Sequence, residues 1–306
     1  MDKHQVFFEL STKDAAPERD AASKRSTWAS VFANIFLTLA QITAGVFSHS
    51  QGLIADGIHS LSDLVADFVV LLALHHSQKG PDQDHQYGHQ RYENAASLVL
   101  GGLLLSVGIG MVWSAAQKLQ TPSNIPTVHL TALWVALGAL AVKESLFRYL
   151  LSVAERVRSS MLAANAWHAR SDAASSLVVA IGIGGNLLGY PLFDPIAALI
   201  VGFMVAKMGW SFAWNALQDL TDRAVGPDQV AAIEAEIRAT PGVLGLHELR
   251  TRKTGDMILA DVHLEIDGNL TVAQGHDIAR RARLAVISNH PVLYLVTHVD
   301  PVLPPF

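Results

Sequence analysis

Long apolar stretches separated by short polar connections dominate the first two thirds of the chain. A helix needs about 20 mostly apolar residues to cross the hydrocarbon core of a lipid bilayer. Six stretches reach about that length, so the pattern predicts an α-helical membrane protein with six transmembrane helices. Their expected ranges are 26–48, 52–76, 94–117, 129–151, 161–187 and 189–208.

The pattern changes after Asp219, where the apolar runs shorten and charged residues return. Segments of helical periodicity and segments of strand-like alternation follow each other there in the order α-β-β-α-β. This order is typical of a small α+β sandwich, ferredoxin-like or metallochaperone-like, whose helices cover one face of a sheet. We therefore expect an N-terminal lead at 1–25, a transmembrane domain at 26–221 and a separate C-terminal domain at 222–306.

Composition and charge support a membrane protein and indicate its orientation. Half of the 306 residues are apolar, 16% are charged and the mean hydropathy is +0.29, which is unusual for a soluble globular chain. Alternate connections, at 1–27, 78–92 and 152–160, hold five, two and two Lys or Arg residues, nine in all, whereas the other three hold only Lys118. This asymmetry predicts that both termini are cytoplasmic.

Two classes of function are excluded at this stage. The net charge of −5 and the lack of a basic patch argue against a nucleic-acid partner. The chain has no cysteine, so neither a disulfide framework nor a thiolate metal site can form.

Four ionisable residues interrupt the second apolar stretch, at Asp56, His59, Asp63 and Asp67. At 100° per residue they fall within about 80° of one another on a single helical face. An ionisable group at the centre of a bilayer costs about 2.5–3.5 kcal/mol on insertion scales, so such a stripe indicates a function. We expect His59 and Asp63 to be ligands, and Asp56 and Asp67 to line an entry path, cap a helix or pair helices.

The fifth stretch repeats the His-x-x-x-Asp spacing with His168 and Asp172. Two such faces, one on each helix, would supply two imidazoles and two carboxylates, a set that suits a tetrahedral divalent metal ion, Zn²⁺ first. The ligands release protons on binding metal and regain them on release, as a proton-coupled exchanger requires. The alternative is a cluster of interhelical hydrogen bonds or a proton relay without metal.

Other polar residues have simpler interpretations. Lys143 and Arg148, near the expected cytoplasmic end of the fourth span, are expected to extend to the membrane surface, with Glu144 pairing with Arg148 at i, i+4. Asp82, His85 and His89 form a candidate metal site in the loop after the second span, or else a polar loop. The tail carries further candidates at strand ends and on one helix, or else surface histidines: His247, His263, His276, His298 and Asp300.

On its motifs the chain resembles the cation diffusion facilitators, and among them the bacterial YiiP-type (FieF-type) zinc exporters. The resemblance covers about Ser26 to Pro301. Besides the two H/D-x-x-x-D faces, it is carried by DxxHxxGHxRxE at 82–93, LTDRA at 220–224, HELRTR at 247–252, HLE at 263–265 and HVDP at 298–301.

The resemblance implies a homodimeric antiporter of divalent metal ions and protons, with six helices and a cytoplasmic metallochaperone-like domain. By motif position His59, Asp63, His168 and Asp172 form the transport site. The first of these is usually aspartate in the YiiP-type branch, so His59 is a departure that favours Zn²⁺. Cd²⁺, Fe²⁺, Co²⁺ and Mn²⁺ stay open as alternatives.

The resemblance also assigns roles outside the transport site. Asp82, His85 and His89 match a second metal site. Arg91 and Asp222 match a charge pair that locks protomers together near the membrane surface. A binuclear site in the soluble domain would be formed by His247, His263, His276, His298 and Asp300, with Asp300 bridging two ions.

The sequence therefore predicts a zinc exporter driven by inward protons. A membrane-anchored metal sensor or scaffold without transport is the alternative, although a scaffold would gain by replacing its intramembrane charges with leucine. We expect no enzymatic activity, because the His-Glu-x-x-His motif of a metalloprotease occurs in none of the spans.

Overall fold

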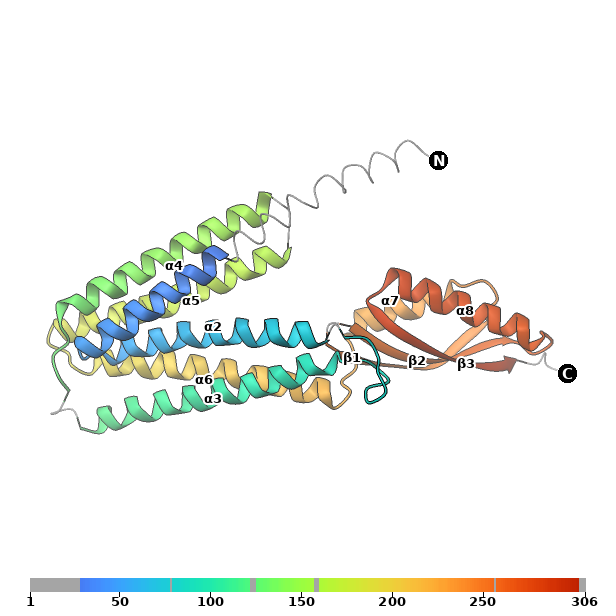
Figure 1. The fold of residues 1–306 in the computed structure, drawn as a ribbon, viewed down its shortest axis with the longest axis horizontal. Coiled ribbons are helices and arrows are strands. Elements are labelled where there is room, and N and C mark those ends of the chain that lie inside the picture. The colour runs from blue at the N-terminus through green and yellow to red at the C-terminus, as the bar shows by residue number, and fades with distance from the viewer. Residues whose placement is uncertain (1–27, 78, 122–124, 157–159, 256, 303–306) are drawn as a thin grey trace. The chain divides into compact units, whose positions relative to one another are not determined.

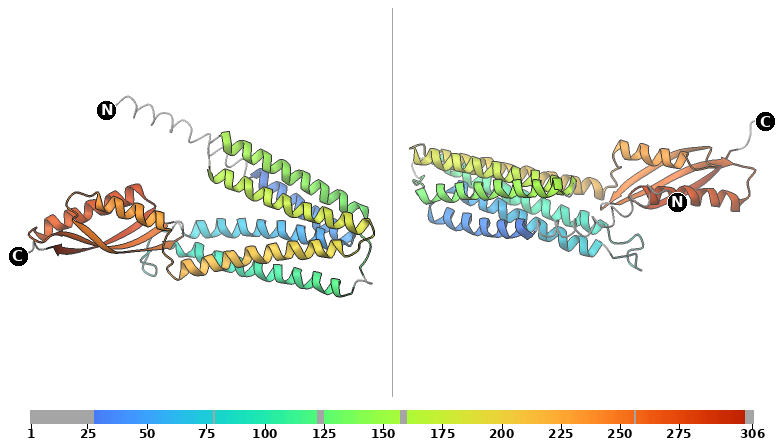
Figure 2. Two further views of the ribbon diagram at one scale, coloured as in Figure 1. Left: turned by 180° about the vertical axis from the view of Figure 1, so that it is seen from behind. Right: turned by 90° about the horizontal axis from the view of Figure 1, so that it is seen from above.

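The computed structural model describes residues 28–302, apart from 78, 122–124, 157–159 and 256. The expected lead at 1–25 lies outside the described residues. The chain forms two compact units (Figures 1 and 2). One unit contains residues up to 68 together with 103–210, and the other contains 69–102 together with 211 onward.

Six long helices occupy the six expected apolar stretches in the described part of the chain (Figure 1). Four of them, Trp28–Phe47, Arg91–Gln120, Leu130–Arg156 and Phe193–Leu220, are long and apolar enough to cross a membrane by length and composition. The count of six spans therefore stays a prediction. The helices are Trp28–Phe47, α2 (Gln51–Ser77), α3 (Arg91–Gln120), α4 (Leu130–Arg156), α5 (Ser160–Leu187) and α6 (Phe193–Leu220).

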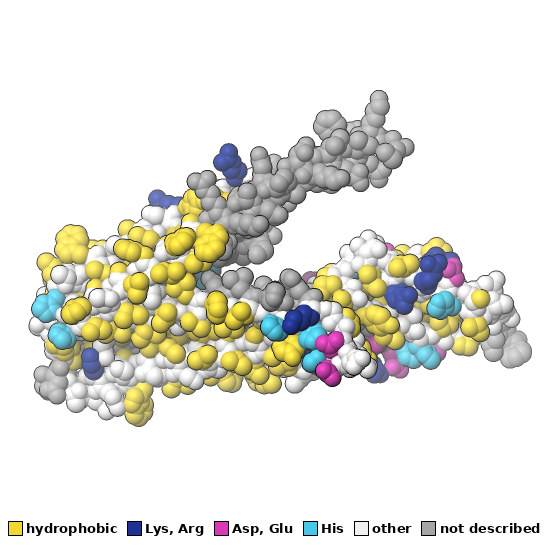
Figure 3. Space-filling model, in the orientation of Figure 1, with side chains coloured by type: hydrophobic (Ala, Val, Ile, Leu, Met, Phe, Trp, Pro, Cys, Tyr) yellow, Lys and Arg dark blue, Asp and Glu magenta, His cyan; other side chains and the backbone are white. Residues whose placement is uncertain are grey.

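The outer surface of these helices is apolar, as contact with lipid requires. Large side chains lie exposed on several of them, for example Phe36 at 68%, Trp113 at 67%, Trp134 at 68% and Phe203 at 66%. On the face shown in Figure 3, hydrophobic side chains cover the long helices and charged ones are few. Apolar surface of this extent is avoided by soluble monomers, so these helices belong to a multi-pass membrane protein.

Glycines on α3 and α6 let the backbones of these two helices approach each other closely. A Cβ at Gly108 would lie 2.3 Å from the backbone nitrogen of Ala206, and one at Gly209 would lie 2.3 Å from that of Leu105. Small residues at a helix contact allow close approach and van der Waals packing inside a membrane, where no hydrophobic effect drives association. Any side chain at these positions would force the two helices apart.

The start of α2 is capped by a carboxylate from another helix. Asp194, near the start of α6, is 2% exposed and accepts hydrogen bonds from the backbone N–H groups of Gln51 (2.7 Å) and Gly52 (3.2 Å) and from the Ser50 hydroxyl (2.6 Å). These are unsatisfied donors of a helix N-terminus, where negative charge is also favoured by the helix dipole. The cap therefore fixes α2 against α6.

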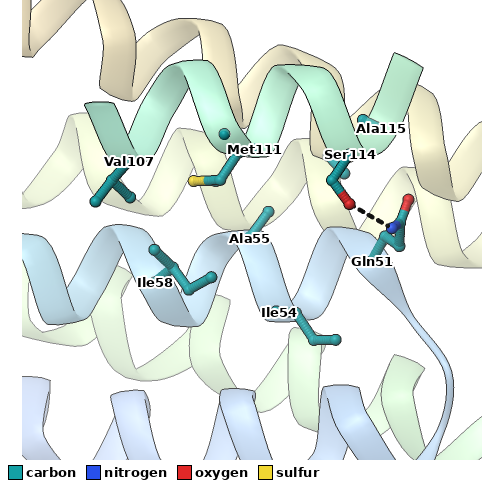
Figure 4. Close-up of a pocket in the computed structure, with 10 residues that line it drawn as sticks. Gln51, Ile54, Ala55, Ile58, Val107, Met111, Ser114 and Ala115 are labelled. Atoms are coloured by element: carbon teal, nitrogen blue, oxygen red, sulfur yellow. Dashed lines mark hydrogen bonds between the residues drawn. The ribbon is translucent and has the colours of Figure 1, made fainter. Parts of the chain in front are cut away.

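A groove between α2, α3 and α6 has a volume of about 340 Å³ (Figure 4). Ala55, Ile58 and Met111 line it, and the polar side chains of Gln51 and Ser114 bond to each other at 3.3 Å. None of its ten lining residues is ionisable. The polar face of α2 is therefore directed to other neighbours.

The C-terminal part has the expected α-β-β-α-β order. Its sheet has the strand order β1-β2-β3, in which β1 pairs antiparallel with β2 and β2 pairs parallel with β3. Helices α7 and α8 cover one face of this sheet (Figures 1 and 2). The small α+β fold is thereby confirmed. The elements are α7 (Pro227–Arg238), β1 (Gly245–Thr254), β2 (Met257–Asp267), α8 (Val272–Asn289) and β3 (Val292–Val302).

Alternation along β2 decides which face of the sheet meets the helices. Val262, Leu264 and Ile266 are at most 4% exposed, and Val262 and Leu264 share a core with residues of α7 and α8. His263 lies between them in sequence and is therefore directed to the opposite, helix-free face, because successive strand residues point to opposite sides.

We predict that Gly108→Val lowers the thermal unfolding midpoint of the detergent-purified protein, because overpacking costs about 1–3 kcal/mol. Gly110→Val is the matched control on α3, since a Cβ at Gly110 meets no atom within 4 Å. Equal midpoints for the two variants would contradict the α3–α6 contact.

Candidate metal centres

Three groups of histidine and carboxylate side chains could each hold a metal ion among the described residues. In each group the ligand atoms lie within 4.8 Å of one another. One lies between α2 and α5, one in the loop before α3 and one on the C-terminal sheet. Their members are His59, Asp63 and Asp172; Asp82, His85 and His89; and His247, His263 and Asp300.

The helical group places one imidazole between two carboxylates. Nδ1 of His59 is 3.8 Å from Oδ2 of Asp63 on the same helix, and its Nε2 is 3.6 Å from Oδ1 of Asp172 on α5. The three side chains are only 6%, 12% and 15% exposed. Ligands at about 2.0–2.1 Å from a tetrahedral Zn²⁺ are about 3.3 Å apart, so small rotations would bring these atoms to that spacing.

His59 has a free coordinating atom inside the protein. Its Nδ1 is buried and has no hydrogen-bond partner among the described residues. Buried polar groups are normally hydrogen-bonded, and each exception requires an explanation. Coordination of a metal ion by Nδ1 is such an explanation, because neutral imidazole is a common ligand of divalent transition metals.

His168 lies outside this group of three, although it is close enough to interact electrostatically with Asp63 and Asp172. It lies one turn before Asp172 on α5, but its side chain is exposed. Its neighbour Arg170 stacks on Phe147 at 4.8 Å and Trp167 at 5.3 Å from the ring centroids. The side chain of Asp67, the last residue of the predicted stripe, lies outside the described part of the chain.

Asp56 pairs helices, which was one of the roles expected for it, whereas Lys143 does not extend to the membrane surface as the sequence suggested. Asp56 is fully buried and Lys143 is 3% exposed, with Nζ 3.1 Å from Oδ1 of the carboxylate. The predicted pair of Glu144 and Arg148 is present, at 2.8 Å. The partner of Lys143 lies 87 residues away in sequence, so no local pattern indicated it.

The loop group is organised by a turn around Asp82. Its Oδ1 accepts backbone hydrogen bonds from His85 (2.7 Å) and Asp84 (3.0 Å), and the bond from His85 holds the pKa of Asp82 below its usual value. Oδ2 lies 3.3 Å from Nε2 of His89, and the rings of His85 and His89 are 4.4 Å apart. The ionised carboxylate and two imidazoles are therefore directed to one point.

The C-terminal histidines form a row across the three strands. His247 pairs with His263 on β2, and His263 pairs with His298 on β3, so the three rings follow one another at 5.0 and 4.6 Å. Asp300 is two residues beyond His298 on the same strand face. The row lies on the helix-free face of the sheet.

Asp300 contacts all three histidines of the row. Oδ2 lies 2.8 Å from Nδ1 of His263 and 3.2 Å from Nε2 of His247, and Oδ1 lies 3.3 Å from Nε2 of His298. The hydrogen bond to His263 is the main reason why the pKa of Asp300 lies below its usual value. His276 is exposed on α8, and none of the described contacts joins it to Asp300.

The predicted charge pair forms within a single chain. Arg91, at the start of α3, donates to Asp222, just after α6, and Arg252 of β1 lies 3.5 Å from the other carboxylate oxygen. Asp222 has φ +61°, a left-handed backbone conformation that places its carboxylate between the two guanidinium groups. A contact of this pair between protomers stays a prediction.

Comparisons with known proteins cover nearly the whole described chain. Residues 27–221 match the family described as "Cation efflux transmembrane domain", and residues 225–302 match "Cation efflux protein, cytoplasmic domain". A solved structure titled as a MamM-CTD variant is 28% identical, covers 25% of this chain and 99% of that chain, and has a TM-score of 0.24.

Curated relatives are efflux and tolerance proteins for metals. The chain is 33% identical to Metal tolerance protein C1 of Arabidopsis thaliana, over 88% of this chain and 60% of the length of that relative. It is 30% identical to the manganese efflux system protein MneS and 31% identical to MneP, both of Bacillus subtilis. These matches cover 89% and 94% of this chain and 93% and 98% of the relatives. The chain therefore belongs to the cation efflux family, the cation diffusion facilitators.

Proposed function

We propose that this protein exports Zn²⁺ from the cytoplasm across the cell inner (plasma) membrane in exchange for protons, with both termini cytoplasmic. The observation that carries the proposal is the buried His59 of α2, whose Nδ1 lacks a partner and whose ring lies between two carboxylates. His59, Asp63 and Asp172 bind the ion. His168 shares the face of Asp172 on α5 and completes the set as this helix moves.

Charge balance supports exchange of metal for protons. Two carboxylates and neutral imidazoles bring a dication to neutrality, which offsets the cost of placing charge inside the bilayer. When the ion leaves, protons take its place on the same ligands. Access from one side at a time would then move metal and protons in opposite directions.

Two observations bear on the choice of metal. His59 supplies a nitrogen donor, which favours Zn²⁺ over ions that prefer oxygen. Two relatives are named for manganese efflux, so Mn²⁺ is the alternative substrate. Competition among Zn²⁺, Mn²⁺, Cd²⁺, Co²⁺ and Fe²⁺ in transport assays separates these possibilities.

The other two groups serve regulation in this proposal. Metal bound by the histidine row stabilises a homodimer through the helix-free sheet face. The loop group around Asp82 binds a further ion near Arg91, which forms the charge pair with Asp222. Occupancy of these sites would bias the transport equilibrium through coupled binding.

We predict that Asp63→Ala reduces Zn²⁺ uptake into proteoliposomes with an imposed pH gradient to the rate of empty liposomes, because the site loses a charged ligand. Glu144→Ala removes an exposed carboxylate of α4 and should transport at the parental rate. Parental flux in Asp63→Ala would refute the site. If the parental protein binds Zn²⁺ but no Zn²⁺ accumulates inside the proteoliposomes, a metal sensor or scaffold is favoured instead.

We predict that His59→Asp lowers the ratio of Zn²⁺ to Mn²⁺ flux by about tenfold, because it replaces a nitrogen donor by oxygen. Both fluxes are measured in the same vesicles, so a general loss of folding changes both and leaves the ratio constant. A ratio that stays at the parental value would show that His59 does not set metal preference.

We predict that Asp300→Ala weakens metal binding to the histidine row by about 10- to 100-fold, since it removes the group that contacts all three rings. An aspartate is ionised at neutral pH, and the hydrogen bond with His263 holds the pKa of Asp300 lower still, so the carboxylate carries its charge throughout the titration. Asp261→Ala, on the exposed side of β2, is the control in a titration of the full-length protein.

A further inference from the structure

Asp56 and Lys143 form a buried ion pair, and neither residue belongs to the group of side chains that could hold the metal ion. The carboxylate is fully buried in α2 and the ammonium is 3% exposed in α4. A buried ion pair has a large desolvation cost and is commonly no more stable than a well-packed apolar pair. Its presence in a membrane bundle therefore indicates a requirement other than stability.

The Asp56 carboxylate is contacted by four donor side chains from three other helices. Lys143 Nζ and the Ser175 hydroxyl each lie 3.1 Å from Oδ1, and the Ser176 hydroxyl lies 2.6 Å from Oδ2. Gln41, on the helix Trp28–Phe47, donates its side-chain amide to the same Oδ2. With these partners in place Asp56 has no oxygen directed to the metal ligands.

The pair lies against the proposed transport site. Asp56 is three residues before His59 on α2, and Ser175 is three residues after Asp172 on α5, which is about one helical turn in each case. The Ser175 hydroxyl also lies 2.7 Å from the backbone oxygen of Asp172. The charge of Lys143 also reaches His59, Asp63 and Asp172, although it is the smallest of the interactions named at each of them.

We propose that Lys143 is a positioning residue that sets the charge of the transport site, by cancelling Asp56 and leaving Asp63 and Asp172 as the two negative charges that match one dication. This inference rests on the proposed function of the site. Without Lys143 a third carboxylate faces the ion, whereas without Asp56 an unpaired ammonium repels it. Both effects are transmitted through a buried, low-dielectric interior, where charges interact more strongly than in water.

The two single substitutions should therefore change affinity in opposite directions. Lys143→Met strengthens Zn²⁺ binding by about tenfold and slows its release, and Asp56→Asn weakens binding by about tenfold. The double variant Asp56→Asn/Lys143→Met restores neutrality and binds within about threefold of the parental protein. A purely structural pair would instead weaken binding in both single variants.

The experiment uses the full-length chain in which Asp82, His85, His89 and Asp300 are replaced by alanine, so that the helical site dominates the titration. Zn²⁺ is the probe, competed against a chromophoric chelator, and release is followed after adding excess chelator. The matched controls on α4 are Glu144→Gln and Arg148→Met, which remove charges from an exposed pair and should bind like the parental protein.

The outcomes separate the inference from the proposed function. If Asp63→Ala in this background binds Zn²⁺ as tightly as the parental protein, the site itself is wrong. If Asp63→Ala abolishes binding but both single variants shift affinity the same way, or neither shifts it, the role of Lys143 is overturned. Should Lys143→Met fail to fold, Lys143→Gln replaces it, because glutamine keeps a donor for Asp56.

Discussion

A carboxylate inside a membrane bundle must be matched by cations or hydrogen-bond donors, and the helical unit is arranged around this requirement. Four carboxylates meet it in three ways. Asp194 uses the free N–H groups of α2, and Asp56 uses a lysine, two serines and a glutamine. Asp63 and Asp172 have a histidine between them and, among the described residues, no comparable set of donors. The carboxylates without fixed donors are those available to a metal ion.

Some helices of this unit touch through short, specific contacts, and others border a loosely filled groove. Helices α3 and α6 touch through glycine at backbone distance, and the cap by Asp194 holds the start of α2 to α6. Beside these contacts the groove between α2 and α3 is lined by small and flexible apolar residues, with one weak polar contact. Packed helices move as units where contacts are short and specific, and shift where they are loosely filled. The helix that carries His59 is therefore fixed at its start by Asp194 and again at Asp56, whereas its side toward α3 is loosely filled.

Much of this arrangement follows from periodicity, and the rest depends on how helices rotate against each other. His59 and Asp63 share a face because they are one turn apart, and the row of histidines follows from alternation in three strands. Lys143 looked like a surface lysine because its partner is on another helix. His168 lies on the face of Asp172, yet it stays exposed, since the orientation of α5 is set by Ser175 and Ser176 at Asp56 and by Arg170 on Phe147 of α4. The exposed position of His276 on α8 has no local signal, because it depends on which sheet face the helices cover.

The histidine row depends on strand parity. His247, His263 and His298 are neighbours only because each strand presents them on the helix-free face at the same level. A slip of one residue in β2 would turn His263 into the core and bring Val262 or Leu264 to the surface. Insertions and deletions in this strand are therefore tolerated only in pairs of residues, whereas substitutions of the exposed residues between the histidines are much less restricted. The sheet thus constrains the length of its strands more strongly than most of their composition.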